Sequence, residues 1–246
     1  MHFLITAFNT ILYQPLFNAL VFLYQYLPGQ DFGVAVIVLT VLIRFLLYPL
    51  MVMSIKSQKK LSELQPKIQE IQQKHKDDKE KQSKEMMALY QKEKINPFGG
   101  CLPLLIQLPI LIALYRVFWK GMQPEAMNLL YSFIPNPGTI NPTFLGLINL
   151  GEASILIAVL AGITQFFQSK MLMPKEKASY QKEGQMAQFS GMMQKQMLYF
   201  FPIFTVFILW KLPAAIGIYW IITALFSIGQ QYLIFKPQTK NEPAKS

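Results

Sequence analysis

Arg44 is the residue whose position most clearly indicates chemistry, because it lies inside a long apolar stretch. Residues 32–53 supply the roughly 20 residues that a membrane-spanning helix needs, and Arg44 stands near their middle. An arginine at that depth costs about 2.5–3.5 kcal/mol on insertion scales, and no apolar stretch offers an acidic partner in its interior. Arg44 is therefore expected to meet water, polar side chains or an anionic ligand; a purely structural arginine is the alternative.

Other polar side chains occur in the apolar stretches and could surround Arg44. Thr40 precedes it by one helical turn, on the same face. Gln107 lies near the middle of residues 97–119, and Tyr219 and Trp220 lie in residues 214–235. Each alone is typical of an ordinary bond between membrane helices. Together they predict a polar, water-filled groove that binds a substrate, formed by Arg44, Thr40, Gln107, Trp220 and Tyr219.

Residues suited to covalent or metal chemistry are scarce. A single cysteine, Cys101, cannot form an intramolecular disulfide. The two histidines, His2 and His75, lack neighbours at metal-ligand spacing. The aspartates all lie outside the apolar stretches, where they could not serve an intramembrane protease. The sequence therefore predicts no catalytic residue, no metal and no cofactor, and hence no enzyme.

The elements that must position Arg44 are long apolar segments. The 246-residue chain is 52% hydrophobic and only 15% charged, whereas soluble domains carry about 25% charged residues. We predict an all-α membrane protein with five transmembrane helices, at residues 32–53, 97–119, 148–168, 197–210 and 214–235. The chain is too apolar for a soluble domain or a disordered one.

The charge of +10 is unevenly distributed and predicts the topology. Residues 54–95 hold 11 lysines and 7 acidic residues, residues 169–195 are also basic, and residues 1–43 and 121–151 contain no lysine or arginine. Basic loops stay in the cytoplasm, so the N-terminus is expected outside and the C-terminus inside. We assign the excess charge to this orientation and to anionic lipids, rather than to sequence-specific binding of nucleic acid.

The segments outside the five spans divide the chain further. Residues 1–30 repeat apolar side chains at helical spacing with polar interruptions, which predicts an amphipathic helix in the outer interface; a cleaved segment and a sixth span are the alternatives. Residues 54–94 are predicted to form a cytoplasmic helical hairpin, either a docking arm or merely solvated helices. The five-helix core thus covers residues 31–236, and residues 237–246 form a disordered basic tail.

Several motifs resemble those of YidC-type membrane protein insertases. The most specific is Asn96-Pro97-Phe98-Gly99-Gly100-Cys101-Leu102-Pro103-Leu104-Leu105-Ile106-Gln107-Leu108-Pro109. The others are Arg44-Phe45-Leu46-Leu47-Tyr48-Pro49-Leu50, Leu64-Gln65-Pro66-Lys67-Ile68, Glu85-Met86-Met87-Ala88-Leu89-Tyr90 and Gln230-Gln231-Tyr232-Leu233-Ile234. The resemblance covers about residues 10–236.

This resemblance implies five core helices around a hydrated groove that opens to the cytoplasm and to lipid. The family's groove arginine matches Arg44, and its polar groove positions match Thr40, Gln107 and Trp220. It implies a bacterial inner-membrane insertase and chaperone for nascent membrane proteins, acting alone or with the Sec translocon, the ribosome and the signal recognition particle. Compared with the family, we expect no large outer domain of the kind found in some relatives, no lipoprotein cysteine of the kind found in others, and no ribosome anchoring by the short tail.

The residues by themselves leave two rival functions open. A small solute or ion transporter could use Arg44 to bind an anion, although the sequence shows no inverted repeat of broken helices. The other rival is an assembly factor in which Arg44 is buried and has only a structural role. Insertion of a short-tailed substrate by the purified protein, without nucleotide or another translocase, would separate an insertase from both.

Overall fold

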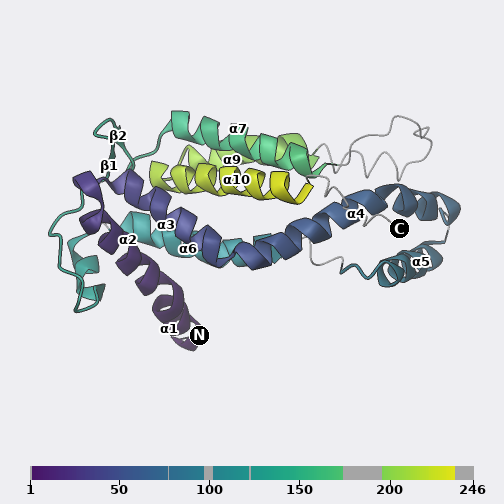
Figure 1. The fold of residues 1–246 in the computed structure, drawn as a ribbon, viewed down its shortest axis with the longest axis horizontal. Helices are drawn as coiled ribbons and strands as arrows, with labels where there is room; N and C mark the ends of the chain where they lie inside the picture. The colour runs from purple at the N-terminus through teal and green to yellow at the C-terminus, as the bar shows by residue number, and fades with distance from the viewer. Residues whose placement is uncertain (1, 77, 97–101, 122, 174–195, 236–246) are drawn as a thin grey trace, which may run out of the picture.

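The computed structural model describes residues 2–76, 78–96, 102–121, 123–173 and 196–235, and these residues are mostly helical (Figure 1). The N-terminal half contains α1 (His2–Phe8), the π-helical η1 (Asn9–Tyr13), α2 (Gln14–Tyr26), the 3₁₀ turn η2 (Pro28–Gln30), α3 (Phe32–Leu46), α4 (Tyr48–Lys74) and α5 (Lys79–Lys92). The rest contains α6 (Leu102–Lys120), the 3₁₀-helical η4 (Pro124–Leu129), β1 (Thr143–Phe144), β2 (Ile148–Asn149), α7 (Ile155–Leu172), the π-helical η5 (Gln196–Phe200), α9 (Phe201–Leu209) and α10 (Ala214–Phe235).

Several of these helices are long and apolar enough to cross a membrane. Three qualify as continuous spans, Phe3–Tyr26, Ile155–Leu172 and Ala214–Phe235, and the bent pair α3–α4 brings the number to four. Two more apolar helices, Leu105–Trp119 and Leu198–Leu209, are shorter. The predicted helical, multi-pass membrane protein is confirmed in these terms. The number of five transmembrane helices stays a prediction.

The span predicted over residues 32–53 is broken in the structure, because α3 and α4 meet at Leu47 with a bend of 68°. Pro49, in the first turn of α4, accounts for the break. Its ring has no N–H to donate to the carbonyl of Phe45, so the hydrogen-bond pattern of α3 cannot continue into α4 at this point. Arg44 therefore lies in the last turn of α3 rather than midway along one continuous helix.

Two glycines allow helices of the bundle to approach each other closely. A Cβ atom on Gly162 of α7 would come within 2.4 Å of a methyl group of Val206 on α9, and one on Gly217 of α10 within 2.5 Å of Ile157 on α7. Small residues permit such close approach between membrane helices. Around these contacts α7, α9 and α10 lie side by side (Figure 1).

The hairpin expected at residues 54–94 is present, built from α4 and α5. Leu64 and Ile68 of α4 are buried, and Lys67 Nζ pairs with a carboxylate oxygen of Glu93 at 2.7 Å. Asp78 caps α5 by accepting a hydrogen bond from Lys81 N at 2.9 Å. Asp77 lies outside the described residues.

At the opposite end of the molecule, the N-terminal helices pack against the loop that joins α6 to α7. Asn18 of α2 donates to the carbonyl of Leu129 and accepts from Tyr131 N, at 3.0 and 2.7 Å. The chain then breaks at Pro28-Gly29, where Gly29 has a φ of 82°. Figure 1 shows α1 and α2 running obliquely to the bundle. Because Phe3–Tyr26 is long and apolar enough to cross a membrane, the interfacial placement of this segment stays a prediction.

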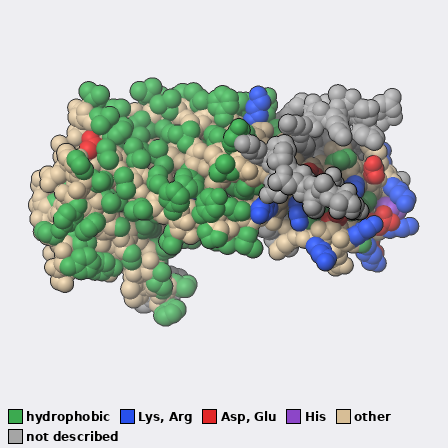
Figure 2. Space-filling model, in the orientation of Figure 1, with side chains coloured by type: hydrophobic (Ala, Val, Ile, Leu, Met, Phe, Trp, Pro, Cys, Tyr) green, Lys and Arg blue, Asp and Glu red, His purple; other side chains and the backbone are tan. Residues whose placement is uncertain are grey.

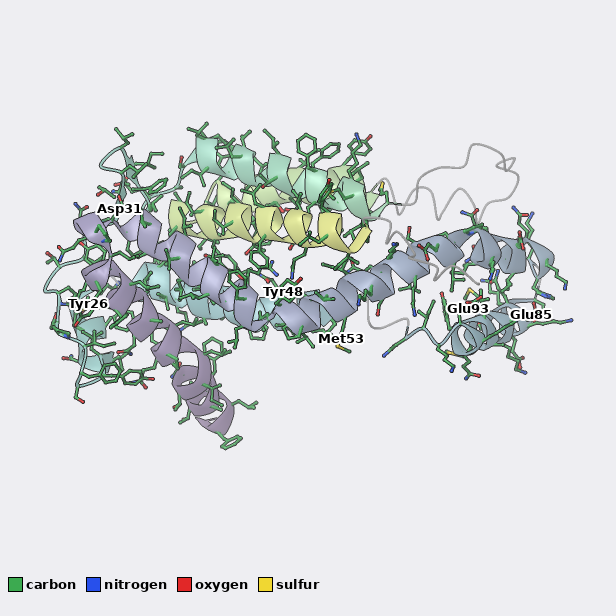
Figure 3. All side chains as sticks on the ribbon, in the orientation of Figure 1. Tyr26, Asp31, Tyr48, Met53, Glu85 and Glu93 are labelled. Atoms are coloured by element: carbon green, nitrogen blue, oxygen red, sulfur yellow. The ribbon has the colours of Figure 1, made fainter. Side chains whose placement is uncertain are left out.

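Hydrophobic and charged side chains separate along the long axis. Hydrophobic side chains dominate the surface over the bundle, whereas lysines and acidic residues gather around α4 and α5 (Figure 2). Asp31 lies at one end of the molecule and Glu85 and Glu93 at the other (Figure 3). This distribution is typical of a membrane-embedded body with one water-exposed end. The basic loop at 174–195 and the tail lie outside the described residues.

Candidate functional site

Arg44 is buried but has no ionic partner in the described part of the chain. Its side chain is only 5% exposed, and no described residue accepts a hydrogen bond from its Nε atom. The ion pairs among the described residues all lie in the α4–α5 hairpin and involve other side chains. Nor do these residues bring three metal-ligating side chains together anywhere. A buried guanidinium in this state requires water or a guest molecule, since an uncompensated charge in an apolar interior is costly.

Gln107 and Tyr219 are brought together beside Arg44. The amide Nε2 of Gln107 on α6 donates a hydrogen bond to the hydroxyl oxygen of Tyr219 on α10, at 2.5 Å. Tyr219 is fully buried and lies close enough to Arg44 for an electrostatic interaction. Three of the predicted groove residues, from three different helices, therefore form one polar cluster without a carboxylate. Such a cluster favours an anion or a water-solvated polar group.

Thr40 and Trp220 are placed differently. The Thr40 hydroxyl is buried and donates to the carbonyl of Val36 in its own helix at 2.6 Å. Trp220 donates through its indole N–H to Oε1 of Gln165 on α7 at 2.9 Å, away from the cluster that contains its neighbour Tyr219. Thr40 lies one turn from Arg44 but forms no described hydrogen bond with the cluster. A role of the five predicted groove residues in substrate binding stays a prediction; they are Arg44, Thr40, Gln107, Trp220 and Tyr219.

Two glutamines near the end of α10 also lie in the buried interior, and the sequence analysis did not assign them to the site. Gln230 and Gln231 are 3% and 1% exposed. Gln230 follows Tyr219 by eleven positions, which places it about 20° around the helix and about 16 Å along it. That spacing within an apolar helix was the available signal, since polar side chains on one face of a spanning helix usually face the protein interior.

Arg116, the second arginine of the chain, was also missed. Its Nη1 atom donates to Oδ1 of Asn9 at 2.9 Å. The guanidinium also lies over the rings of Phe8 and Tyr13, 5.7 and 5.2 Å from their centres. Arg116 thereby joins α6 to the N-terminal helices, and its place in an otherwise apolar helix could have indicated such a partner.

The fold and the cluster define a multi-pass helical membrane protein with a polar, positively charged interior. The chain belongs to the 60Kd inner membrane protein family, whose model matches residues 22–242. The match includes α3, α6 and α10 and therefore every residue of the Arg44 cluster.

Curated relatives support the same assignment. The chain is 37% identical over 218 residues to the membrane protein insertase YidC of Clostridium tetani, covering 89% of this chain and 88% of that protein. It is 33% identical over 206 residues to the YidC of Fusobacterium nucleatum, covering 84% and 87%. The YidC of Wigglesworthia glossinidia brevipalpis is 35% identical over 228 residues, but this chain spans only 37% of its length. These comparisons give no support to a solute transporter.

Proposed function

We propose that this protein is a membrane protein insertase and chaperone, which moves nascent membrane proteins from the cytoplasm into the bilayer. The observation that carries the proposal is the buried Arg44, which has no carboxylate partner within the described residues and lies beside the neutral pair Gln107–Tyr219. A fixed positive charge among neutral polar groups can attract an acidic, hydrated tail without binding it permanently. The relatives' shared name supports the same reading.

The proposed mechanism needs no covalent step and no cofactor. The polar tail of a substrate enters a hydrated groove lined by Arg44, Thr40, Gln107, Trp220 and Tyr219, where water and the arginine lower its desolvation cost. The attached hydrophobic segment then moves into lipid. Burial of its apolar surface, worth about 25 cal/mol per Å², drives the process.

The finer architecture belongs to the same proposal. Five transmembrane helices surround the groove, which opens to the cytoplasm, in a bacterial inner membrane. The N-terminus is outside with an interfacial helix, and the C-terminus is inside. The lysine-rich α4–α5 hairpin and the basic segments contact anionic lipid headgroups. The hairpin also receives substrates, from the Sec translocon, the ribosome or the signal recognition particle.

The test is reconstitution of the purified full-length chain into liposomes without nucleotide or any other translocase. A single-span substrate with a short acidic tail should acquire a protease-protected tail in these liposomes and not in empty ones. Equal protection in both would refute an insertase. Uptake of a small anion without insertion would point to a transporter instead.

A further inference from the structure

The carboxamide of Gln230 and the amide oxygen of Gln231 are buried without hydrogen-bond partners in the part of the chain that the structure describes. Neither Nε2 nor Oε1 of Gln230 has a partner among the described residues, and the same holds for Oε1 of Gln231. A buried polar atom without a partner costs about 1–3 kcal/mol. The three unpaired atoms of these two consecutive residues therefore destabilise the observed packing. Their presence requires an explanation other than the stability of the fold.

The end of α10 that carries these glutamines contacts the junction of α3 and α4. Phe226, four residues before Gln230, packs edge-on against Phe45 of α3 with ring centres 5.2 Å apart. Phe235, four residues after Gln231, lies under the ammonium group of Lys59 of α4 at 5.4 Å. The 68° bend at Leu47 lies between Phe45 and Lys59 in the sequence, so a change in this bend would alter the contact between α4 and the end of α10.

A carboxamide matches one chemical group of a translocated chain especially well, the peptide bond. Both the carboxamide and the peptide bond contain an N–H donor group and a carbonyl acceptor, and neither carries a charge. A polar tail that enters the membrane in an extended state carries unpaired backbone groups, each costing several kcal/mol in an apolar surrounding. The neutral amides of α10 can pair with those groups whatever the tail's sequence, whereas Arg44 favours acidic side chains.

We propose that α4 pivots at Leu47 and that the exposed amides of Gln230 and Gln231 then bind the extended backbone of the inserting tail. This inference rests on the proposed insertase function. The unpaired amides destabilise the closed contact, and backbone groups of the substrate satisfy them in the open one. The site therefore recognises any polar tail, and Arg44 adds the preference for negative charge.

The experiment compares the wild-type chain with the double variant Gln230→Met, Gln231→Met in liposomes, at matched protein levels. The substrates carry an acidic tail, a neutral tail or a neutral tail rich in proline, which has no backbone N–H. Gln25→Met is the control, because the Gln25 amide donates to the carbonyl of Pro135 at 2.6 Å, near the opposite end of the molecule. Thermal unfolding of each variant is measured in parallel.

We expect the double variant to insert the acidic and neutral tails about five- to thirtyfold more slowly, which corresponds to the loss of one to two hydrogen bonds of about 1 kcal/mol each. The proline-rich tail should lose less, and the melting temperature should stay equal or rise. Unchanged insertion would overturn the inference, as would a lower melting temperature, which would make the amides structural. Loss with the acidic tail only would assign the effect to Arg44. Failure of the wild type with all three substrates would instead refute the insertase function.

Discussion

The amide of Gln107 donates a hydrogen bond to the hydroxyl of Tyr219, a residue 112 positions later in the sequence. The bond joins α6 to α10 beside Arg44. It also orients the Tyr219 side chain, which lies close enough to Arg44 for an electrostatic interaction. The geometry around Arg44 therefore depends on this contact.

Tyr219→Phe should destabilise the protein, because Gln107 loses its acceptor while the ring still fills its site. The expected cost is about 1 kcal/mol, and Gln107→Leu should cost a similar amount. Thermal unfolding in detergent of both single variants and the double variant would measure the coupling. Strictly additive effects would mean that the two groups do not interact in the membrane protein.

Arg44→Lys should retain much more insertion of acidic-tailed substrates than Arg44→Ala or Arg44→Glu. Lysine keeps the charge, whereas alanine removes a hydrogen-bonding cation worth about 1.5–3 kcal/mol, so the loss should be at least about tenfold. Stability of the alanine variant should change little or rise, since Arg44 has no ion pair to lose among the described residues. Insertion of acidic and neutral tails at matched protein levels is the measurement. A lysine variant as inactive as alanine would contradict a solvated charge and indicate a bidentate ligand.

Arg116→Ala should release the N-terminal helices from α6. The variant loses the hydrogen bond to Asn9 and two cation–π contacts, the latter worth about 0.5–2 kcal/mol each. Hydrogen exchange of residues 2–13 should therefore accelerate while α10 stays protected. Arg116→Lys keeps a cation over the rings and serves as the matched control with a smaller effect. Equal protection in all three proteins would show that other contacts hold this segment.

The contact between α4 and α5 should weaken at acidic pH. The hydrogen bond from Lys67, together with its charge, lowers the pKa of Glu93 below the ordinary value of 4.5. The pair therefore stabilises the hairpin above that value, and the contribution disappears as the pH falls through the lowered pKa. Energy transfer between labels on the two helices should report the loosening, and Glu93→Gln should remove this pH dependence. Glu80→Gln is the control, because Glu80 pairs with Lys84 inside α5.

Topology can be tested with single cysteines at Lys74, Asn136 and Lys182 in a Cys101→Ser background. A membrane-impermeant thiol reagent added to intact cells should label only the cysteine at Asn136, because the other two positions are predicted to be cytoplasmic. Permeabilised cells provide the positive control for all three. Labelling at Lys74 or Lys182 in intact cells would refute the proposed orientation. A cysteine at Thr6 tests whether the N-terminus is outside.

The sequence predicted those features that depend on local chemistry. Apolar length indicated helices that could cross a membrane, and the polar, lysine-rich composition of residues 54–94 indicated the α4–α5 hairpin. It also selected Arg44, Gln107 and Tyr219, because polar side chains are rare in apolar segments. The contact between Gln107 and Tyr219, and that between Arg116 and Asn9, could not be predicted. They join distant segments, and helical periodicity does not say which neighbour a face will meet. The bend at Leu47 had a local signal in Pro49, but proline is tolerated in many membrane helices.

The contacts of Gly162 with Val206 and of Gly217 with Ile157 have a mechanical consequence. At these glycines no Cβ separates α7 from α9 and α10, so we expect the three helices to move as one unit. Widening of the groove proposed beside Arg44 would then depend mainly on α3, α4 and α6. We therefore expect α7, α9 and α10 to keep their positions while the bent pair α3–α4 moves. The residues that set the rate of opening should then lie around Leu47.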